Sequence, residues 1–154
     1  MICQRSLSVY SGHVTDEDRE DLGAMFAWIT RRLIDAEEPV LAGHGLTMWE
    51  YIVLRQLIRQ PAPSQLTLAR EIRYDKTRLI KLLDGLQARG LVIRQPDPSD
   101  RRSHLVSLTP TGRKLHAAVR TQIRAMEADF LSGINPRQRE TLLAILTRLA
   151  VAPP

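Results

Sequence analysis

The chain has 154 residues, of which 25% are charged and 44% hydrophobic, an ordinary globular composition that excludes a disordered or low-complexity chain. No apolar run approaches membrane-spanning length, and the first residues lack the apolar stretch of a signal peptide, so we expect a cytoplasmic protein. The single cysteine, Cys3, excludes an intramolecular disulfide framework.

Positive charge is concentrated in the middle third of the chain. The formal net charge is +5, but residues 64–114 alone carry +6, which leaves the remainder at −1. Charge segregated in this way is typical of a surface that binds nucleic acid.

The first predicted helix covers residues 15–38. Thr15 can cap its N-terminus, apolar residues follow at helical spacing, and Pro39 is expected to end it. We therefore expect residues 1–14 to be a flexible N-terminus and residues 15–45 to form this helix and its connection.

Two shorter helices are predicted next. Thr47 and Glu50 stand in the register of a capping box, and the helix that they open should stop near Pro61. Ser64 can cap a third helix that runs to about Ile72.

A fourth helix is predicted from Asp75, in an N-cap position, to Gly90. Its apolar face is formed by Leu79, Leu82, Leu83 and Leu86, and its opposite face by Thr77, Lys81 and Asp84, flanked by Lys76 and Arg78. The third and fourth helices then form a helix-turn-helix pair whose second helix presents a mostly basic face, as an element that enters the major groove of DNA does.

Residues 91–109 are predicted to form a β-hairpin with a charged tip. Two aliphatic and β-branched runs flank a loop in which Asp97 and Pro98 fit the first two positions of a type I turn. The loop carries the triplet Asp100, Arg101 and Arg102, which suits a polyanion, although a solvated surface turn is the alternative.

Two further helices follow the hairpin, one opened by Thr109 and Pro110 and one by Asn135 and Pro136. Together with the first helix they expose more apolar surface than a basic module of about fifty residues can cover. A two-fold partner would cover it, and the alternative is a monomer in which these helices fold back.

A helix-turn-helix pair followed by a charged hairpin is a winged helix, and the residues of this one resemble the MarR family of bacterial transcription regulators. The resemblance covers roughly residues 46–115 and rests on several consecutive pieces. These are Leu46-Thr47 with Tyr51 and Leu54, Leu68-Ala69 with Ile72, Leu82-Leu83-Asp84 with Leu86, Arg89-Gly90-Leu91-Val92, Asp97-Pro98-Ser99-Asp100-Arg101-Arg102 and Leu108-Thr109-Pro110-Thr111-Gly112.

The resemblance implies which residues face DNA. The fourth helix would lie in the major groove with Lys76, Thr77, Arg78 and Lys81 toward it. Arg78 suits a bidentate contact to guanine, and the two lysines suit phosphates. On the wing, Arg101 and Arg102 would reach DNA while Asp100 positions them; for each basic residue, a solvated surface charge is the alternative.

The sequence departs from the family pattern at two positions. Gly85 stands where another basic residue is common, and glycine inside a helix costs about 1 kcal/mol relative to alanine. Arg73 replaces the usual small turn residue. The first departure puts one phosphate contact in doubt, and the second supplies a charge that is able to add one.

The resemblance also implies an effector, since many relatives bind small aromatic ligands between the dimer helices and the winged helix. The candidates for lining such a pocket are Trp28, His44, Met48, Trp49 and Tyr51, with core packing as the alternative for each. Some members sense oxidants through one cysteine; Cys3 is the candidate, although no base stands beside it. The four histidines show no metal-ligand spacing.

The sequence as a whole predicts a mainly α protein with a small β-hairpin wing: a winged helix-turn-helix over residues 46–114, with a dimerisation helix before it and C-terminal dimerisation helices over residues 115–154. We expect a homodimeric, ligand-responsive repressor that binds a pseudo-palindromic site in double-stranded DNA, without enzymatic activity, cofactor or membrane partner. The alternatives are a winged-helix module that contacts an acidic protein and an architectural DNA binder without sequence preference.

Overall fold

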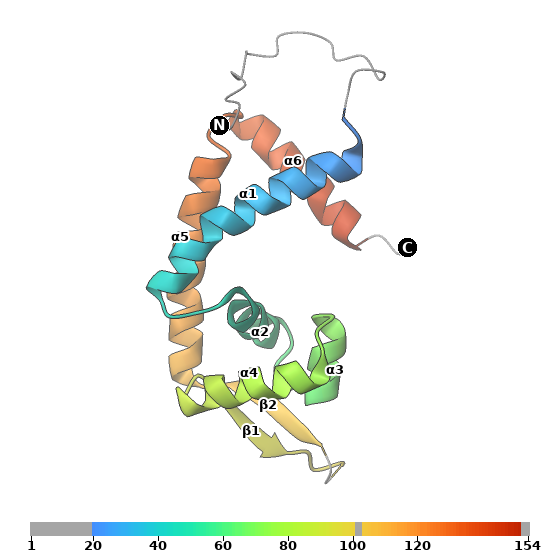
Figure 1. Cartoon of the computed structure of the whole chain (residues 1–154), viewed down its shortest axis with the longest axis vertical. Coiled ribbons are helices and arrows are strands. Elements are labelled where there is room, and N and C mark those ends of the chain that lie inside the picture. Colours follow the sequence, from blue (N-terminus) through green and yellow to red (C-terminus); the bar gives the residue numbers. More distant parts are fainter. Residues whose placement is uncertain (1–19, 101–102, 152–154) are drawn as a thin grey trace, which may run out of the picture. The chain divides into compact units, whose positions relative to one another are not determined.

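The computed structural model describes residues 20–100 and 103–151, and within them the chain forms six helices and one antiparallel hairpin (Figure 1). The predicted fold class is therefore confirmed. The elements are α1 (Leu22–Gly43), α2 (Met48–Arg59), α3 (Gln65–Glu71), α4 (Lys76–Ala88), β1 (Val92–Pro96), β2 (His104–Leu108), α5 (Pro110–Phe130) and α6 (Pro136–Val151). The chain divides within α1 into two compact units, residues up to 32 and residues from 33 onward, and the buried core belongs to the second.

The boundaries predicted for the first helix are wrong at both ends. Glu20 and Asp21 are not helical, and the helix continues through Pro39 to Gly43. Proline removes one backbone donor and normally disfavours a helix interior. The helical turn after Pro39 is stabilised because the side chain of Leu41 lies in the core and is only 2% exposed. The free energy gained by this burial outweighs the cost of proline in the helix.

The caps predicted from the sequence for the later helices, α2 to α6, form as expected, whereas Thr15, the cap predicted for the first helix, lies outside the described residues. In the capping box of α2, the backbone N–H of Thr47 donates to Glu50 Oε2 (2.7 Å) and that of Glu50 donates to Thr47 Oγ1 (3.3 Å). Asn135 and Gln138 make the same reciprocal pair at the start of α6. Single caps are supplied by Ser64 for α3, Asp75 for α4 and Thr109 for α5.

The helix-turn-helix pair is α3 and α4 with a tight turn between them. Arg73 lies in that turn with φ of 51°, a left-handed conformation that is uncommon for a residue with a side chain. The backbone N–H of Tyr74 donates to Ala69 O (2.9 Å) and closes the turn. At the far end of α4, Gly90 takes φ of 66° and lets the chain leave the helix toward β1.

The hairpin pairs Val92 with Leu108 through to Pro96 with His104. A contact that the sequence did not predict extends it: the N–H of Val106 donates to Pro63 O (3.0 Å), and Ser64 forms a bridge with Leu105. The segment before α3 therefore lies beside β2 and pairs with it at one point. This pairing fixes the wing to the helix-turn-helix pair.

The core lies among α2, the two motif helices α3 and α4, the hairpin and α5. The largest fully buried side chains are Leu41, Val53, Leu54, Leu57, Leu68, Leu79, Leu83, Leu86, Val106 and Val119. The leucines predicted for the inner face of the fourth helix are buried, except that Leu82 is half-buried against the core. The opposite face of α4 is thereby directed to solvent.

Candidate nucleic-acid interface and adjoining cavity

The N-terminal half of α4 presents an exposed basic surface. Lys76, Thr77 and Arg78 form its exposed first turn, and Lys81 follows one turn later, also exposed. Asp75 fixes the start of the helix, because its Oδ1 accepts from the N–H of Arg78 (2.9 Å). The uncompensated N–H groups of a helix N-terminus add to the positive potential. This surface, which we call the α4 surface (Lys76, Thr77, Arg78 and Lys81), is suited to phosphates and base edges.

Gly85 lies one turn beyond Lys81 on α4, where it is exposed. A Cβ at this position would meet no atom within 4 Å. A side chain at residue 85 would therefore be tolerated, and the glycine leaves a gap in the row of basic side chains.

The wing is attached to α4 by a polar cluster that the sequence analysis missed. Arg94, on β1, donates from Nε to Gln87 Oε1 (2.7 Å) and from Nη2 to Asp84 Oδ1 (2.5 Å). Arg94 thus serves to orient the hairpin against the fourth helix. The sequence offers no periodic signal for a pair across two different elements, and helical spacing places Asp84 only on the polar face of the fourth helix.

The tip of the wing is a turn closed by its own backbone. The N–H of Asp97 donates to Ser103 O (3.0 Å), and the N–H of Ser103 donates to Asp100 O (2.9 Å). The side chain of Asp97 accepts two bonds from Ser99, which lowers the pKa of this carboxyl group. Asp100 lies at the tip as predicted, whereas Arg101 and Arg102 lie outside the described residues.

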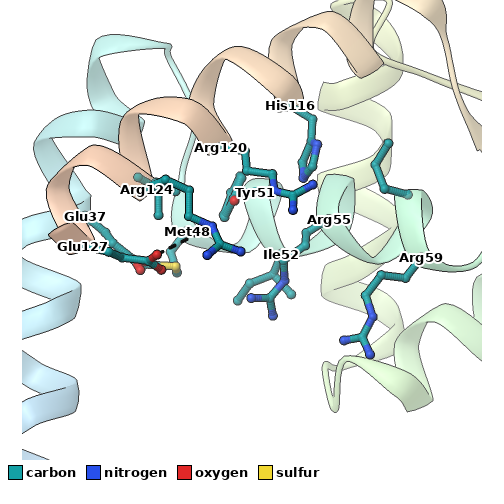
Figure 2. Close-up of a pocket in the computed structure, with 12 residues that line it drawn as sticks. Glu37, Met48, Tyr51, Ile52, Arg55, Arg59, His116, Arg120, Arg124 and Glu127 are labelled. Atoms are coloured by element: carbon teal, nitrogen blue, oxygen red, sulfur yellow. Dashed lines mark ion pairs between the residues drawn. The ribbon is translucent and has the colours of Figure 1, made fainter. Parts of the chain in front are cut away.

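A cavity of about 380 Å³ lies between α2 and α5 (Figure 2). Met48 and Tyr51, two of the residues predicted for an effector pocket, line it. Trp49 instead packs against Tyr74, with ring centroids 4.2 Å apart. His44 lies in the turn after α1 and outside the lining.

The two remaining candidates for sensing lie elsewhere in the chain. Trp28 belongs to the unit before residue 33, and Cys3 lies outside the described residues.

His116 is a functional candidate that the sequence alone does not indicate, because the histidines show no metal-ligand spacing. This side chain lines the cavity, is 4% exposed and stacks on Tyr51 with ring centroids 5.7 Å apart. Within the described part of the chain, its Nε2 has no hydrogen-bond partner. Burial, with the charges of Arg120 and Arg55, lowers the pKa of His116 and favours its neutral form.

Arginines dominate the charge of the cavity. Arg55 and Arg59 come from α2, and Arg120 and Arg124 from α5. Two carboxylates complete the lining, Glu37 and Glu127. Burial and the neighbouring charge of Glu127 raise the pKa of Glu37, although Arg55 opposes this shift.

The described residues, 20–100 and 103–151, hold neither a candidate metal site nor a membrane-spanning helix. No three His, Cys, Asp or Glu side chains gather there in a way that could hold a metal ion. No helix in this part of the chain is long and apolar enough to cross a membrane.

The sequence and the structure both resemble known transcription regulators. Residues 44–103 match the MarR family. A Thauera aromatica protein described as a transcriptional regulatory protein for the hcr operon is 30% identical over 105 residues, which cover 68% of this chain and 63% of that protein. The chain thus spans under two thirds of the length of this curated relative.

Solved structures match over a greater share of the chain. The wild-type, ligand-free MarR of E. coli aligns with a TM-score of 0.77 at 20% identity, covering 85% of this chain and 98% of that one. Bordetella bronchiseptica BpsR, whose DNA binding is regulated by 6-hydroxynicotinic acid, aligns with a TM-score of 0.73 at 26% identity, covering 87% and 96%. These regulators share the winged helix-turn-helix fold of this chain, and residues 44–103 of the chain are similar to the MarR family of transcription regulators.

Proposed function

We propose that this chain binds double-stranded DNA in a sequence-specific manner as a homodimer and represses transcription until a small ligand releases it. The observation that carries the proposal is the α4 surface: a capped, exposed, basic helix start on the second helix of a helix-turn-helix pair. The wing, held to the same helix by Arg94, would contact the flanking backbone.

Dimer formation is supported by the apolar residues of α6. Within the described chain α6 has no buried residue, and the exposed large hydrophobic residues on it are Leu143, Ile145, Leu146 and Leu149. A helix that exposes so much apolar surface usually packs against another copy of the chain. Sedimentation equilibrium should report a dimer for the wild-type chain and a monomer for Leu146→Glu, while Ala144→Glu, on the opposite side of α6, should remain dimeric.

A selection of binding sites from a random duplex pool tests the DNA proposal. It should return two half-sites related by two-fold symmetry and about one helical turn apart. A pool without any consensus would indicate an architectural binder. Salt-resistant binding to an acidic protein, with only weak DNA binding, would indicate a protein-interaction module.

Single substitutions on α4 separate base contacts from phosphate contacts. Arg78→Ala should relax specificity at one base position by about 1–3 kcal/mol. Lys81→Ala should weaken binding to all sequences and lower the salt slope by about one unit. Gly85→Lys should strengthen binding to all sequences and raise that slope, with Gly85→Ala as its matched control. Unchanged affinity and salt dependence in Lys81→Ala would refute the phosphate assignment.

Ligand control is supported by the cavity between α2 and α5, because its volume falls in the range of small-molecule sites. Side chains also link α2 to the helix-turn-helix pair: Gln56 donates to Glu71 of α3, and Arg89, at the end of α4, donates to Glu50. The Bordetella relative, whose DNA binding responds to an aromatic acid, supports the same role. Thermal-shift screening with aromatic acids should identify compounds that raise the melting temperature and weaken DNA binding.

A further inference from the structure

The groove between α2 and α5 carries more positive charge than its own residues neutralise. A second hollow continues the cavity along α5; it shares Arg120, Arg124 and His116 and adds Arg113. The combined lining thus holds five arginines against the two carboxylates Glu37 and Glu127. We call this set the arginine groove.

The two carboxylates neutralise little of this positive charge. Glu127 contacts Arg124 only at 3.7 Å, in an exposed i,i+3 pair of the kind that contributes little. Glu37 lies at the same end of the groove as Glu127 (Figure 2). The second hollow, which adjoins His116 and holds Arg113, Arg120 and Arg124, has no carboxylate in its described lining.

His116 marks that region as a binding site. An unpaired polar atom in a buried position costs about 1–3 kcal/mol, so its Nε2 would gain a partner when a polar ligand enters. The neutral imidazole can donate or accept there. Tyr51 and the apolar side chains Met48, Ile52 and Ile123 supply a surface for a ring or hydrocarbon body.

Guanidinium groups on two different helices point into this space. Figure 2 shows Arg55, from α2, and Arg120 and Arg124, from α5, reaching into the same region. Guanidinium forks pair bidentately with carboxylates. A ligand with one anionic group pairs with arginines on one side of the groove. A ligand with two anionic groups can pair with arginines of both helices and hold the helices together.

We propose that the arginine groove binds an organic dianion, a compact ring-bearing dicarboxylate, that bridges Arg55 of α2 and Arg120 of α5 and contacts His116. The proposal rests on the ligand-controlled function above and specifies the ligand class. DNA is the less suitable occupant, because this site is a hollow with an apolar floor, while the exposed lysines and arginine of α4 offer phosphates an unobstructed surface.

Calorimetry on the full-length protein tests the ligand class at constant ionic strength. The probes are benzene-1,4-dicarboxylate, benzoate and benzamide, which share a ring and carry two, one and no negative charges. The dianion should bind at least tenfold more tightly than benzoate, and benzamide should not bind measurably. Equal affinity for benzamide and the dicarboxylate would overturn the proposal, and so would equal affinity for inorganic phosphate or pyrophosphate.

Substitutions test the position of the site. Arg55→Gln and Arg120→Gln should each reduce dicarboxylate affinity at least tenfold, because each removes one arm of the bridge. Arg70→Gln, an exposed arginine on α3, is the matched control and should bind as the wild type does. Wild-type affinity in both groove variants would overturn the assignment, and loss of binding to unrelated duplex DNA in these variants would assign the groove to DNA.

A failure of the proposed ligand class can be distinguished from a failure of the proposed regulatory function. If no dianion binds but Lys81→Ala still lowers the salt slope of DNA binding, only the ligand class is wrong. If the wild-type chain selects no DNA site, the regulatory proposal itself fails, whatever the groove binds.

Discussion

A substitution at Gly112 tests whether the start of α5 packs directly against the backbone of Leu91. This glycine lies in the first turn of α5, and a Cβ at its position would lie 2.1 Å from Leu91 O and 3.2 Å from Leu108 Cδ2. Ordinary contact begins at 3.4 Å, so in Gly112→Ala the start of α5 must move about 1.3 Å away from the Leu91 backbone. Leu91 O belongs to the backbone, which cannot rotate aside as a side chain can.

The cost of that movement follows from the contacts at the junction. The N–H of Thr109 donates to Leu91 O (3.1 Å), and its hydroxyl donates to Gly90 O (2.6 Å). Losing both bonds costs about 1 kcal/mol each, and the displaced packing costs about 1–3 kcal/mol. The higher helix propensity of alanine offsets about 1 kcal/mol of this loss in stability. We therefore expect Gly112→Ala to lose about 3 kcal/mol, which corresponds to a melting temperature roughly 6–12 °C lower for a chain of this size.

Gly85→Ala is the matched control, because the same chemical change occurs in α4 with no atom in its way. It should gain about 1 kcal/mol from helix propensity alone. Urea denaturation at one fixed protein concentration measures both variants, since the stability of a dimer depends on concentration. A Gly112→Ala protein as stable as the wild type would refute the close approach of α5 to Leu91.

Three further predictions concern stability. Glu50→Ala should lose about 1 kcal/mol, because Glu50 both caps α2 and pairs with Arg89 (2.9 Å); Glu50→Gln keeps the cap and should lose less, as urea denaturation can show. Arg73→Gly should be at least as stable as the wild type, since glycine adopts the left-handed conformation freely, whereas Arg73→Val should lose about 1–2 kcal/mol by the same measurement. His116→Phe should remove a pH dependence: a histidine whose pKa is lowered on folding stabilises the protein above its unfolded pKa of about 6.5, and that stability is lost as the pH falls. If the melting temperatures of the wild type and His116→Phe change by the same amount between about pH 8 and pH 5, protonation of His116 is not coupled to unfolding.

The order of helices, the hairpin and the exposed basic face of α4 could be predicted from the sequence. Each depends on interactions within a few residues: Thr47 with Glu50, Asp75 with the N–H of Arg78, and leucines spaced to fall on one side of a helix. Such interactions are fixed as soon as the local backbone forms. The nucleic-acid interface on α4 was therefore accessible to sequence reasoning, as a prediction that binding experiments must test.

Only the tertiary structure decided what depends on elements that are distant along the chain. Burial of Leu41 carries α1 past Pro39, against the local preference of proline. Arg94 meets Asp84 only because β1 lies along α4, and Arg55 faces His116 only because α2 packs against α5. No sequence periodicity predicts these pairs, because their members lie far apart along the chain. The entropy cost of closing the intervening chain is offset only when the whole core forms. The sequence alone thus determined the local elements and the basic helix, and the packed fold determined the arginine groove.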